Sequence, residues 1–320
     1  MVSHPLLSPQ QQIEHLEEQG IAFNLWGKSN ALQYLRDNTN YFRLKSYKDG
    51  FERVVGGKND GKYLHFDFAM LVDLSIIDML LRNELLPMTL DIEHYAKVNL
   101  MNALEAHGDD GYALVNAFVC SNGRMDESEN PVLRDISRGK SSPFVSNIVS
   151  AHPDYDYPVW EFVEVIPFGT FLRFYRYCAD EFADRGMRDT YYCLQGVKVM
   201  RNGCAHNNCI LNDMRRWADA RRPQHVVVRS LASIGVSSEM RRTKLSNERF
   251  QQIATTFYMH KTYASPGVLK HRARSLWEFT TRMNKHVDYY DHNEQVRSGF
   301  AFIEKIVSGW YPKSLFGEES

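Results

Sequence analysis

The chain has 320 residues, of which 43% are hydrophobic and 24% are charged, with 19 glycines, 11 prolines and a net charge of −1. This composition is that of a globular protein and excludes a disordered or collagen-like chain. Five cysteines are too few for a secreted disulfide scaffold. The start, MVSHPLLSPQQQ, lacks the basic and apolar regions of a leader, and Asp73 and Asp78 interrupt the most apolar stretch. We therefore expect a cytoplasmic protein without membrane insertion.

The first predicted elements are two short helices. Ser8, Pro9 and Gln11 have the spacing of a capping box, which predicts a helix that ends before Gly20. A second short helix is expected after Ser29. The aromatic and basic run NYFRLKSYKDGF follows as a connector, and GGKNDG is typical of a loop.

The longest helical pattern runs from Asp67 to about His107, and Pro87 should kink or divide it because proline lacks an amide hydrogen. Several prolines in 120–158 predict loops that join short helices. Helical pattern returns over 160–177 and again from Arg188 to Met200. No run alternates as a strand does, so the sequence predicts an all-α fold.

Charge is distributed unevenly along the chain. Residues 213–285 carry 15 Lys+Arg against 5 Asp+Glu, whereas residues 1–212 carry 20 against 28. A basic segment on an acidic chain is typical of a protein that binds a polyanion, although a solvated helix surface explains the same pattern. If the segment binds RNA, we expect Arg241, Arg242 and Lys244 to contact the phosphate backbone.

Most familiar catalytic motifs are absent from the sequence, including a glycine-rich phosphate loop, H-E-x-x-H, G-x-S-x-G and paired C-x-x-C. The stretch VMRNGCAHNNCILND instead crowds polar residues between apolar ones. Cys204, His206 and Cys209 are possible zinc ligands, but zinc sites usually bring a second pair of ligands from elsewhere. We therefore predict no metal, and we expect both cysteines to be small buried apolar residues.

Arg201, Asn202 and His206 also suit RNA cleavage without a metal. A histidine can exchange the protons of the ribose 2′-hydroxyl and the leaving oxygen near neutral pH, and arginine can stabilise the phosphoryl oxygens. On a straight helix Arg201 and His206 would point about 140° apart, so Gly203 is expected to break the helix. The same residue types suit a buried Arg–Asn–His hydrogen-bond cluster at a helix end, and the residues alone leave both alternatives open.

The run R-N-G-C-A-H resembles the R-N-x-x-x-H signature of HEPN domains, and its surroundings are similar to the abortive-infection Abi family of the AbiD and AbiF type. Three other stretches resemble that family in order, over roughly residues 8–215. They are NYFRLKSY (40–47), the helix that carries Asp78, Arg82 and Glu93, and WEFVEVIPFGT (160–170). The signature closes with Leu211 and Asn212, but Asn207 and Cys209 stand where the family often has a second histidine and a basic residue.

The resemblance implies a HEPN-type helical bundle over 61–215, with helical extensions over 1–60 and 216–320. It also implies a homodimer in which two motifs meet to form one RNA-cleaving cleft, without a cofactor. His206 would be the general base or acid, Arg201 would stabilise the transition state, Asn202 would orient the histidine or the phosphate, and Asn212 would contact RNA.

The implied function is a metal-independent endoribonuclease of defence against phage, and a regulatory non-coding RNA is a further candidate partner. The alternatives are a HEPN module that binds RNA or protein without cleavage, and the toxin of a toxin–antitoxin pair.

Overall fold

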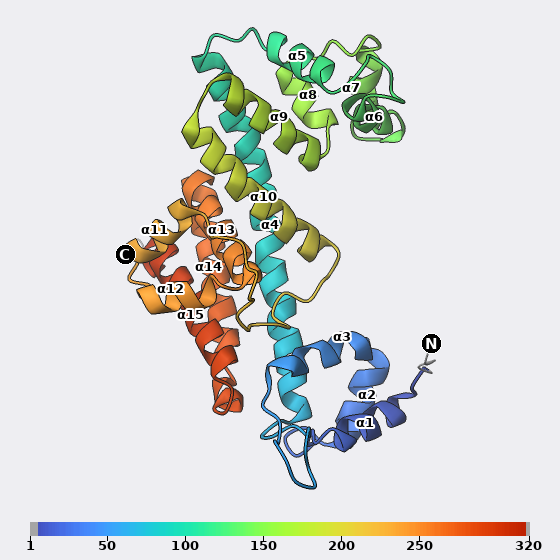
Figure 1. Cartoon of the computed structure of the whole chain (residues 1–320), viewed down its shortest axis with the longest axis vertical. Helices are drawn as coiled ribbons and strands as arrows, with labels where there is room; N and C mark the ends of the chain where they lie inside the picture. Colours follow the sequence, from blue (N-terminus) through green and yellow to red (C-terminus); the bar gives the residue numbers. More distant parts are fainter. Residues whose placement is uncertain (1–5, 318–320) are drawn as a thin grey trace.

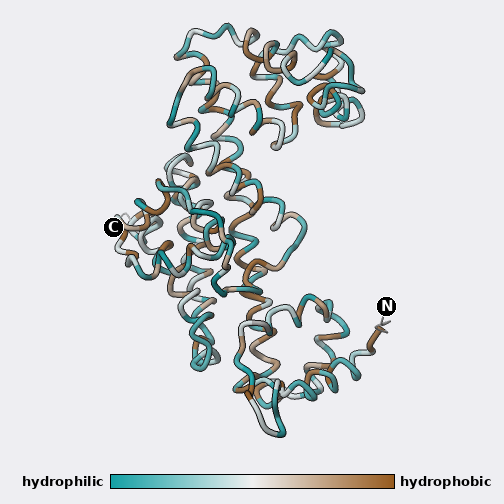
Figure 2. The backbone as a smooth tube through the Cα atoms, viewed as in Figure 1, coloured by the Kyte–Doolittle hydropathy of each residue, from teal (hydrophilic) through white to brown (hydrophobic). Residues whose placement is uncertain are grey.

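The computed structural model describes residues 6–317, and the first and last few residues of the two expected extensions lie outside this range. Within it the protein is all-α, with 15 α-helices, no strand and two isolated β-bridges. Figure 1 shows an elongated molecule built along one long helix, α4. In Figure 2 hydrophobic residues recur along the helices, and they meet in one continuous core.

The N-terminal helices gather at one end of α4 (Figure 1). The predicted capping box is confirmed, because the Ser8 hydroxyl accepts from the Gln11 amide and the Gln11 side chain accepts from the Ser8 amide. The second helix begins one residue before Ser29, at Lys28, with Gly27 as its N-cap. The helices of this end are α1 (Pro9–Glu18), α2 (Lys28–Asp37), α3 (Tyr41–Lys45) and the 3₁₀ helix η1 (Ser46–Gly50).

Helix α4 (Phe68–Ala106) runs for 39 residues and is not divided at Pro87. Its N-terminus is capped by Asp67, whose side chain accepts from the Ala69 amide. Seventeen of its residues are buried, so contacts along most of its length stabilise it despite the proline.

Short helices and loops cover the other end of α4, as expected for 120–158. The helical pattern predicted over 160–177 is divided, because Ile166 is extended before Pro167. The long helix α10 then returns alongside α4 (Figure 1). These elements are α5 (Ala113–Ser121), α6 (Pro131–Ser137), η2 (Arg138–Ser141), α7 (Ser146–Ala151), α8 (Val159–Val165), α9 (Phe168–Glu181) and α10 (Arg185–Ala205).

The C-terminal helices pack on α4 and α10, mainly through α13 and α14. They are α11 (His225–Ser233), α12 (Ser238–Lys244), α13 (Glu248–Tyr263), α14 (Pro266–Met283), η3 (Val287–Tyr290), α15 (Glu294–Trp310) and η4 (Lys313–Leu315). The boundaries at residues 60 and 215 stay a prediction. No helix within residues 6–317 is both long and apolar enough to cross a membrane.

Ion pairs and hydrogen bonds join α4 to the basic C-terminal segment. Asp73 accepts from Arg282 at 2.7 Å and from the Tyr290 hydroxyl at 2.8 Å. Two further carboxylates of α4 also contact this segment. Glu84 Oε2 lies 3.2 Å from Arg272 Nη1, and Asp91 Oδ2 lies 3.2 Å from Nε2 of the buried His260. Residues 73, 84 and 91 are 11 and 7 apart, spacings that return to the same side of a helix. Part of the positive charge in 213–285 therefore neutralises α4.

We predict that Asp73→Ala lowers the free energy of unfolding by about 3–5 kcal/mol, because it leaves Arg282 and the buried Tyr290 hydroxyl without their acceptor. Urea denaturation followed by circular dichroism measures the change. Asp154→Ala, in an exposed loop, is the matched control and should change stability by less than about 0.5 kcal/mol. Equal effects of the two substitutions would contradict a stabilising role for the pairing.

Candidate functional site

The sequence R-N-G-C-A-H forms the C-terminal end of α10. The helix continues through Gly203 to Ala205, so the expected break at Gly203 is wrong, and His206 is the C-cap. The chain then reverses at Asn207, which has a positive φ of 57°. The Asn207 amide donates to the Cys204 carbonyl and the Asn208 amide to the Gly203 carbonyl, the pattern of a Schellman motif.

The loop after His206 is held by a buried ion pair on α4. The Asp78 carboxylate is fully buried, and its Oδ1 accepts from the backbone amides of Ile210 and Leu211, both at 2.6 Å. Arg82 forms an ion pair with Asp78 and donates to the Asn208 carbonyl at 3.2 Å. Asp78 and Arg82 are four residues apart on one side of α4, and together they fix the backbone beyond the motif.

Arg43 and Tyr47 of NYFRLKSY meet the same loop. Arg43 Nη2 lies 3.2 Å from the Asn207 side-chain oxygen and 3.9 Å from Asp78 Oδ2. Tyr47 is buried, and its burial, followed by its interaction with Cys209, raises its pKa above the usual range. The first stretch of the family resemblance therefore contacts the chain just beyond the last one.

Arg201 interacts electrostatically with a second group of charges, on α4 and α8. Burial raises the pKa of Glu93, and the nearby Glu164 adds to the shift, whereas the positive charges of Arg201 and Lys97 oppose it. Lys97 Nζ lies 3.2 Å from Glu164 Oε1. Glu164 is the glutamate of the W-x-x-x-E-x-x-x-x-G-T stretch, so this stretch also lies near the motif.

The side chains of the motif residues Arg201, Asn202 and His206 are available for contacts with a ligand. Within residues 6–317, the side chains of Arg201, Asn202 and His206 make no hydrogen bond and no ion pair. Arg201 and Asn202 are half-buried and His206 is exposed. Asn202 lines a cleft of about 970 Å³. The buried Arg–Asn–His hydrogen-bond cluster, one of the two alternatives, is not what the protein forms.

Two of the residues predicted to contact RNA are engaged in contacts within the protein. Lys244 is buried and donates to the Ser298 hydroxyl at 2.6 Å, and burial lowers its pKa to about 8. Asn212 accepts from Arg249. In this structure Lys244 and Asn212 are thus occupied by internal contacts, which does not favour either as an RNA contact, and both assignments stay predictions.

The two arginines of α12 differ. Arg241 is half-buried and donates to the Val236 carbonyl, whereas Arg242 is exposed. Of the three predicted cationic contacts, Arg242 is thus the most available to a ligand.

The cysteines of the motif do not gather with other ligands. Cys204 is buried, and burial raises its pKa to about 11, whereas Cys209 is half-buried. Within residues 6–317 no group of three or more His, Cys, Asp or Glu side chains could hold a metal ion.

The supporting residues were only partly visible in the sequence. An aspartate and an arginine four residues apart within an otherwise apolar helix, at Asp78 and Arg82, are a signal of buried pairing. The contact of Asp78 with backbone amides 132 and 133 residues away has no local signal.

The fold and the site define an all-α protein whose helix-end motif is anchored through its backbone. The sequence model of the Abi-like protein family matches residues 33–212, more than half of the chain. The protein therefore belongs to the Abi-like family, and this membership suggests a role in abortive-infection defence. The match extends from just before Arg43 to Asn212 and includes the whole anchored site. No curated protein and no solved structure matches the chain.

We predict that Asp78→Asn lowers the free energy of unfolding by about 3–5 kcal/mol, because it leaves the Arg82 charge buried without a counter-ion. The double variant Asp78→Asn/Arg82→Met should be no less stable than the single variant, since it removes that charge. Urea denaturation measures both.

The exposed pair Arg176–Asp180, also four residues apart, is the matched control. Asp180→Asn should cost less than about 1 kcal/mol because water screens this pair. If Asp78→Asn costs no more than Asp180→Asn, Asp78 does not anchor the loop.

Proposed function

We propose that the protein is a metal-independent endoribonuclease of abortive-infection defence, with Arg201, Asn202 and His206 as the catalytic residues. One observation carries the proposal. The backbone around the motif is fixed by Asp78, Arg82 and the Schellman motif, while the three motif side chains have no hydrogen-bond partner among residues 6–317. Polar side chains on a fixed support without internal partners are suited to bind a ligand.

The proposed reaction is cleavage of RNA by its own 2′-hydroxyl. A base takes the proton of the 2′-hydroxyl, the 2′-oxygen bonds to phosphorus, and the bond from phosphorus to the 5′-oxygen breaks as an acid protonates that oxygen. The products carry a 2′,3′-cyclic phosphate and a 5′-hydroxyl. His206 serves as base or acid, and the Arg201 guanidinium stabilises the charge on the phosphoryl oxygens.

A homodimer completes this chemistry. One motif supplies one histidine, whereas the reaction needs a base and an acid at the same phosphate. Two copies related by a two-fold axis supply both histidines. The exposed position of His206 at the end of α10 leaves it open to a second copy. The HEPN assignment of the bundle belongs to this proposal.

We predict that the purified protein cleaves cellular RNA in the presence of EDTA and leaves 2′,3′-cyclic phosphate ends. Arg201→Ala and His206→Ala should each lower the rate by about 10²–10⁴-fold, the usual contribution of a positioned acid, base or charge. Gel electrophoresis and end analysis of the products measure both results.

Matched controls replace the same residue types at positions away from the motif. Arg185→Ala at the other end of α10, and His271→Ala on α14, replace exposed residues and should leave the rate unchanged. Loss of activity in EDTA with recovery on adding a divalent ion would overturn the mechanism. If the wild-type protein binds RNA without cleaving it, and Arg201→Ala and His206→Ala bind RNA as the wild type does, the result would favour an RNA-binding module.

We also predict that the site is shared between two copies. When wild-type and His206→Ala subunits are mixed and allowed to exchange, activity should fall as the square of the wild-type fraction, because a mixed dimer retains one histidine. Native mass spectrometry verifies the exchange. A linear fall would show that each copy works alone.

A further inference from the structure

A cleft of about 970 Å³ lies between α9, α10 and α13. Its walls also include α6 and the connection before α11, so segments from three parts of the chain build it. Asn202 of the motif is one of its lining residues. The cleft lining is basic, with the cations Arg138, Arg173, Lys198, Arg221 and Arg222.

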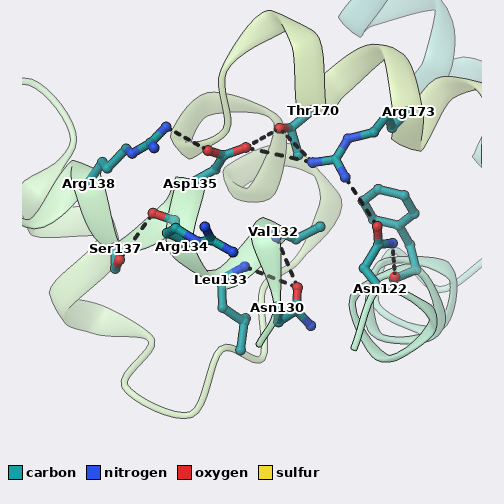
Figure 3. Close-up of polar contacts among 11 residues, drawn as sticks. Asn122, Asn130, Val132, Leu133, Arg134, Asp135, Ser137, Arg138, Thr170 and Arg173 are labelled. Carbon is teal, nitrogen blue, oxygen red and sulfur yellow. Dashed lines mark hydrogen bonds and ion pairs between the residues drawn. The ribbon is translucent and has the colours of Figure 1, made fainter. Parts of the chain in front are cut away.

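Only two carboxylates, Asp135 and Glu248, line the cleft with these five cations. Asp135 pairs with both Arg138 at 2.9 Å and Arg173 at 3.7 Å and also accepts from the Thr170 hydroxyl (Figure 3). Since one carboxylate serves two arginines, the pair of arginines keeps an excess of positive charge.

The other three cations of the cleft have weaker counter-ion contacts or none within residues 6–317. Arg221 lies 3.9 Å from Glu248, and its side chain is 88% exposed. Among residues 6–317, Lys198 and Arg222 have no hydrogen-bond partner and no counter-ion. A Cβ at Gly169 would lie 2.9 Å from Lys198 Nζ, so the glycine leaves space beside this ammonium group. Gly169 and Thr170, the last two residues of the W-x-x-x-E-x-x-x-x-G-T stretch, therefore both contribute to the cleft.

A stripe of side chains on α10 connects the cleft to the motif. Tyr191, Gln195, Lys198 and Asn202 follow one another at spacings of four, three and four, and all four line the cleft. His206, the exposed C-cap, lies four residues beyond Asn202, about one further turn along the helix. A chain bound along the stripe would thus reach the histidine.

We infer that this cleft binds a single-stranded segment of RNA and directs it along α10 to His206. The inference rests on the proposed function and names the path of its substrate. Positive charge attracts the phosphates, amide side chains such as Gln195 offer hydrogen bonds to base edges, and the Tyr192 ring, whose residue is 44% exposed, offers a surface on which a base stacks. A duplex hides its base edges and presents mainly phosphates and sugars, so the amide and aromatic lining favours a single strand.

The test measures binding without cleavage. A fluorescein-labelled RNA of twelve nucleotides, fully 2′-O-methylated so that it cannot be cut, is titrated with each full-length variant, and fluorescence anisotropy gives Kd at several salt concentrations. Lys198→Glu/Arg222→Glu is compared with Lys305→Glu/Lys270→Glu, which makes the same charge change at exposed residues of α15 and α14. Circular dichroism confirms that both variants fold, and the single variant Arg222→Glu, at an exposed residue, repeats the comparison.

The cleft variant should raise Kd about tenfold or more and reduce the slope of log affinity against log salt by about 0.7 for each lost contact. The control variant should change Kd by less than about twofold. Equal weakening by both, or loss only in the control, would overturn the inference. Tighter binding of the matching duplex than of the single strand would also contradict it.

Cleavage is measured separately, with unmodified RNA. If the protein binds RNA through the cleft but does not cleave it, the proposed endoribonuclease activity is refuted and the cleft is retained as an RNA-binding site. Cleavage with an unchanged KM in the cleft variant would refute the cleft and keep the nuclease.

Discussion

The buried Asp78–Arg82 pair is the interaction on which the candidate site depends. Its carboxylate is withdrawn from water and is compensated by Arg82 and by two backbone amides of the loop that follows α10. A buried charge is tolerated only when such partners are complete, so the pair and the loop stabilise each other's position. Arg43 adds a contact from the N-terminal helices. The chain that follows His206 is thus fixed by two distant segments, while the side chains of Arg201, Asn202 and His206 make no hydrogen bond within residues 6–317.

Opposite charges also decide how the C-terminal helices pack. The carboxylates of Asp73, Glu84 and Asp91 lie along α4 and meet Arg282, Arg272 and His260. Part of the positive charge of residues 213–285 is therefore paired inside the molecule, through Arg272 and Arg282. Arg221 and Arg222 of this segment line the cleft beside α10 together with Lys198, and Lys198 and Arg222 lack counter-ions among residues 6–317. A segment's net charge and its availability to a partner are separate properties.

Local signals in the sequence predicted local structure. The capping box at Ser8, the long helix over α4 and the all-α class follow from side-chain spacing and capping, which act within a few residues. The helix at Gly203 continues because its Schellman end and the loop contacts stabilise it, which the glycine alone did not indicate. The burial of Lys244 and the pairing of Asn212 with Arg249 depend on tertiary packing. The sequence therefore revealed the R-N-G-C-A-H motif itself. It did not reveal the contacts that fix the loop after it, because these come from residues more than 100 positions away.

The central claim is that the motif has a fixed backbone and side chains available to RNA, and histidine NMR tests it directly. Protein with isotope-labelled histidine is titrated with the 2′-O-methylated RNA, and His206→Ala assigns the His206 imidazole signals. The account predicts that RNA shifts the His206 signals, while those of the buried His260, held by Asp91 and Tyr311, do not move. RNA that binds without shifting the His206 signals, or that shifts only those of other exposed histidines such as His225 and His271, would contradict it.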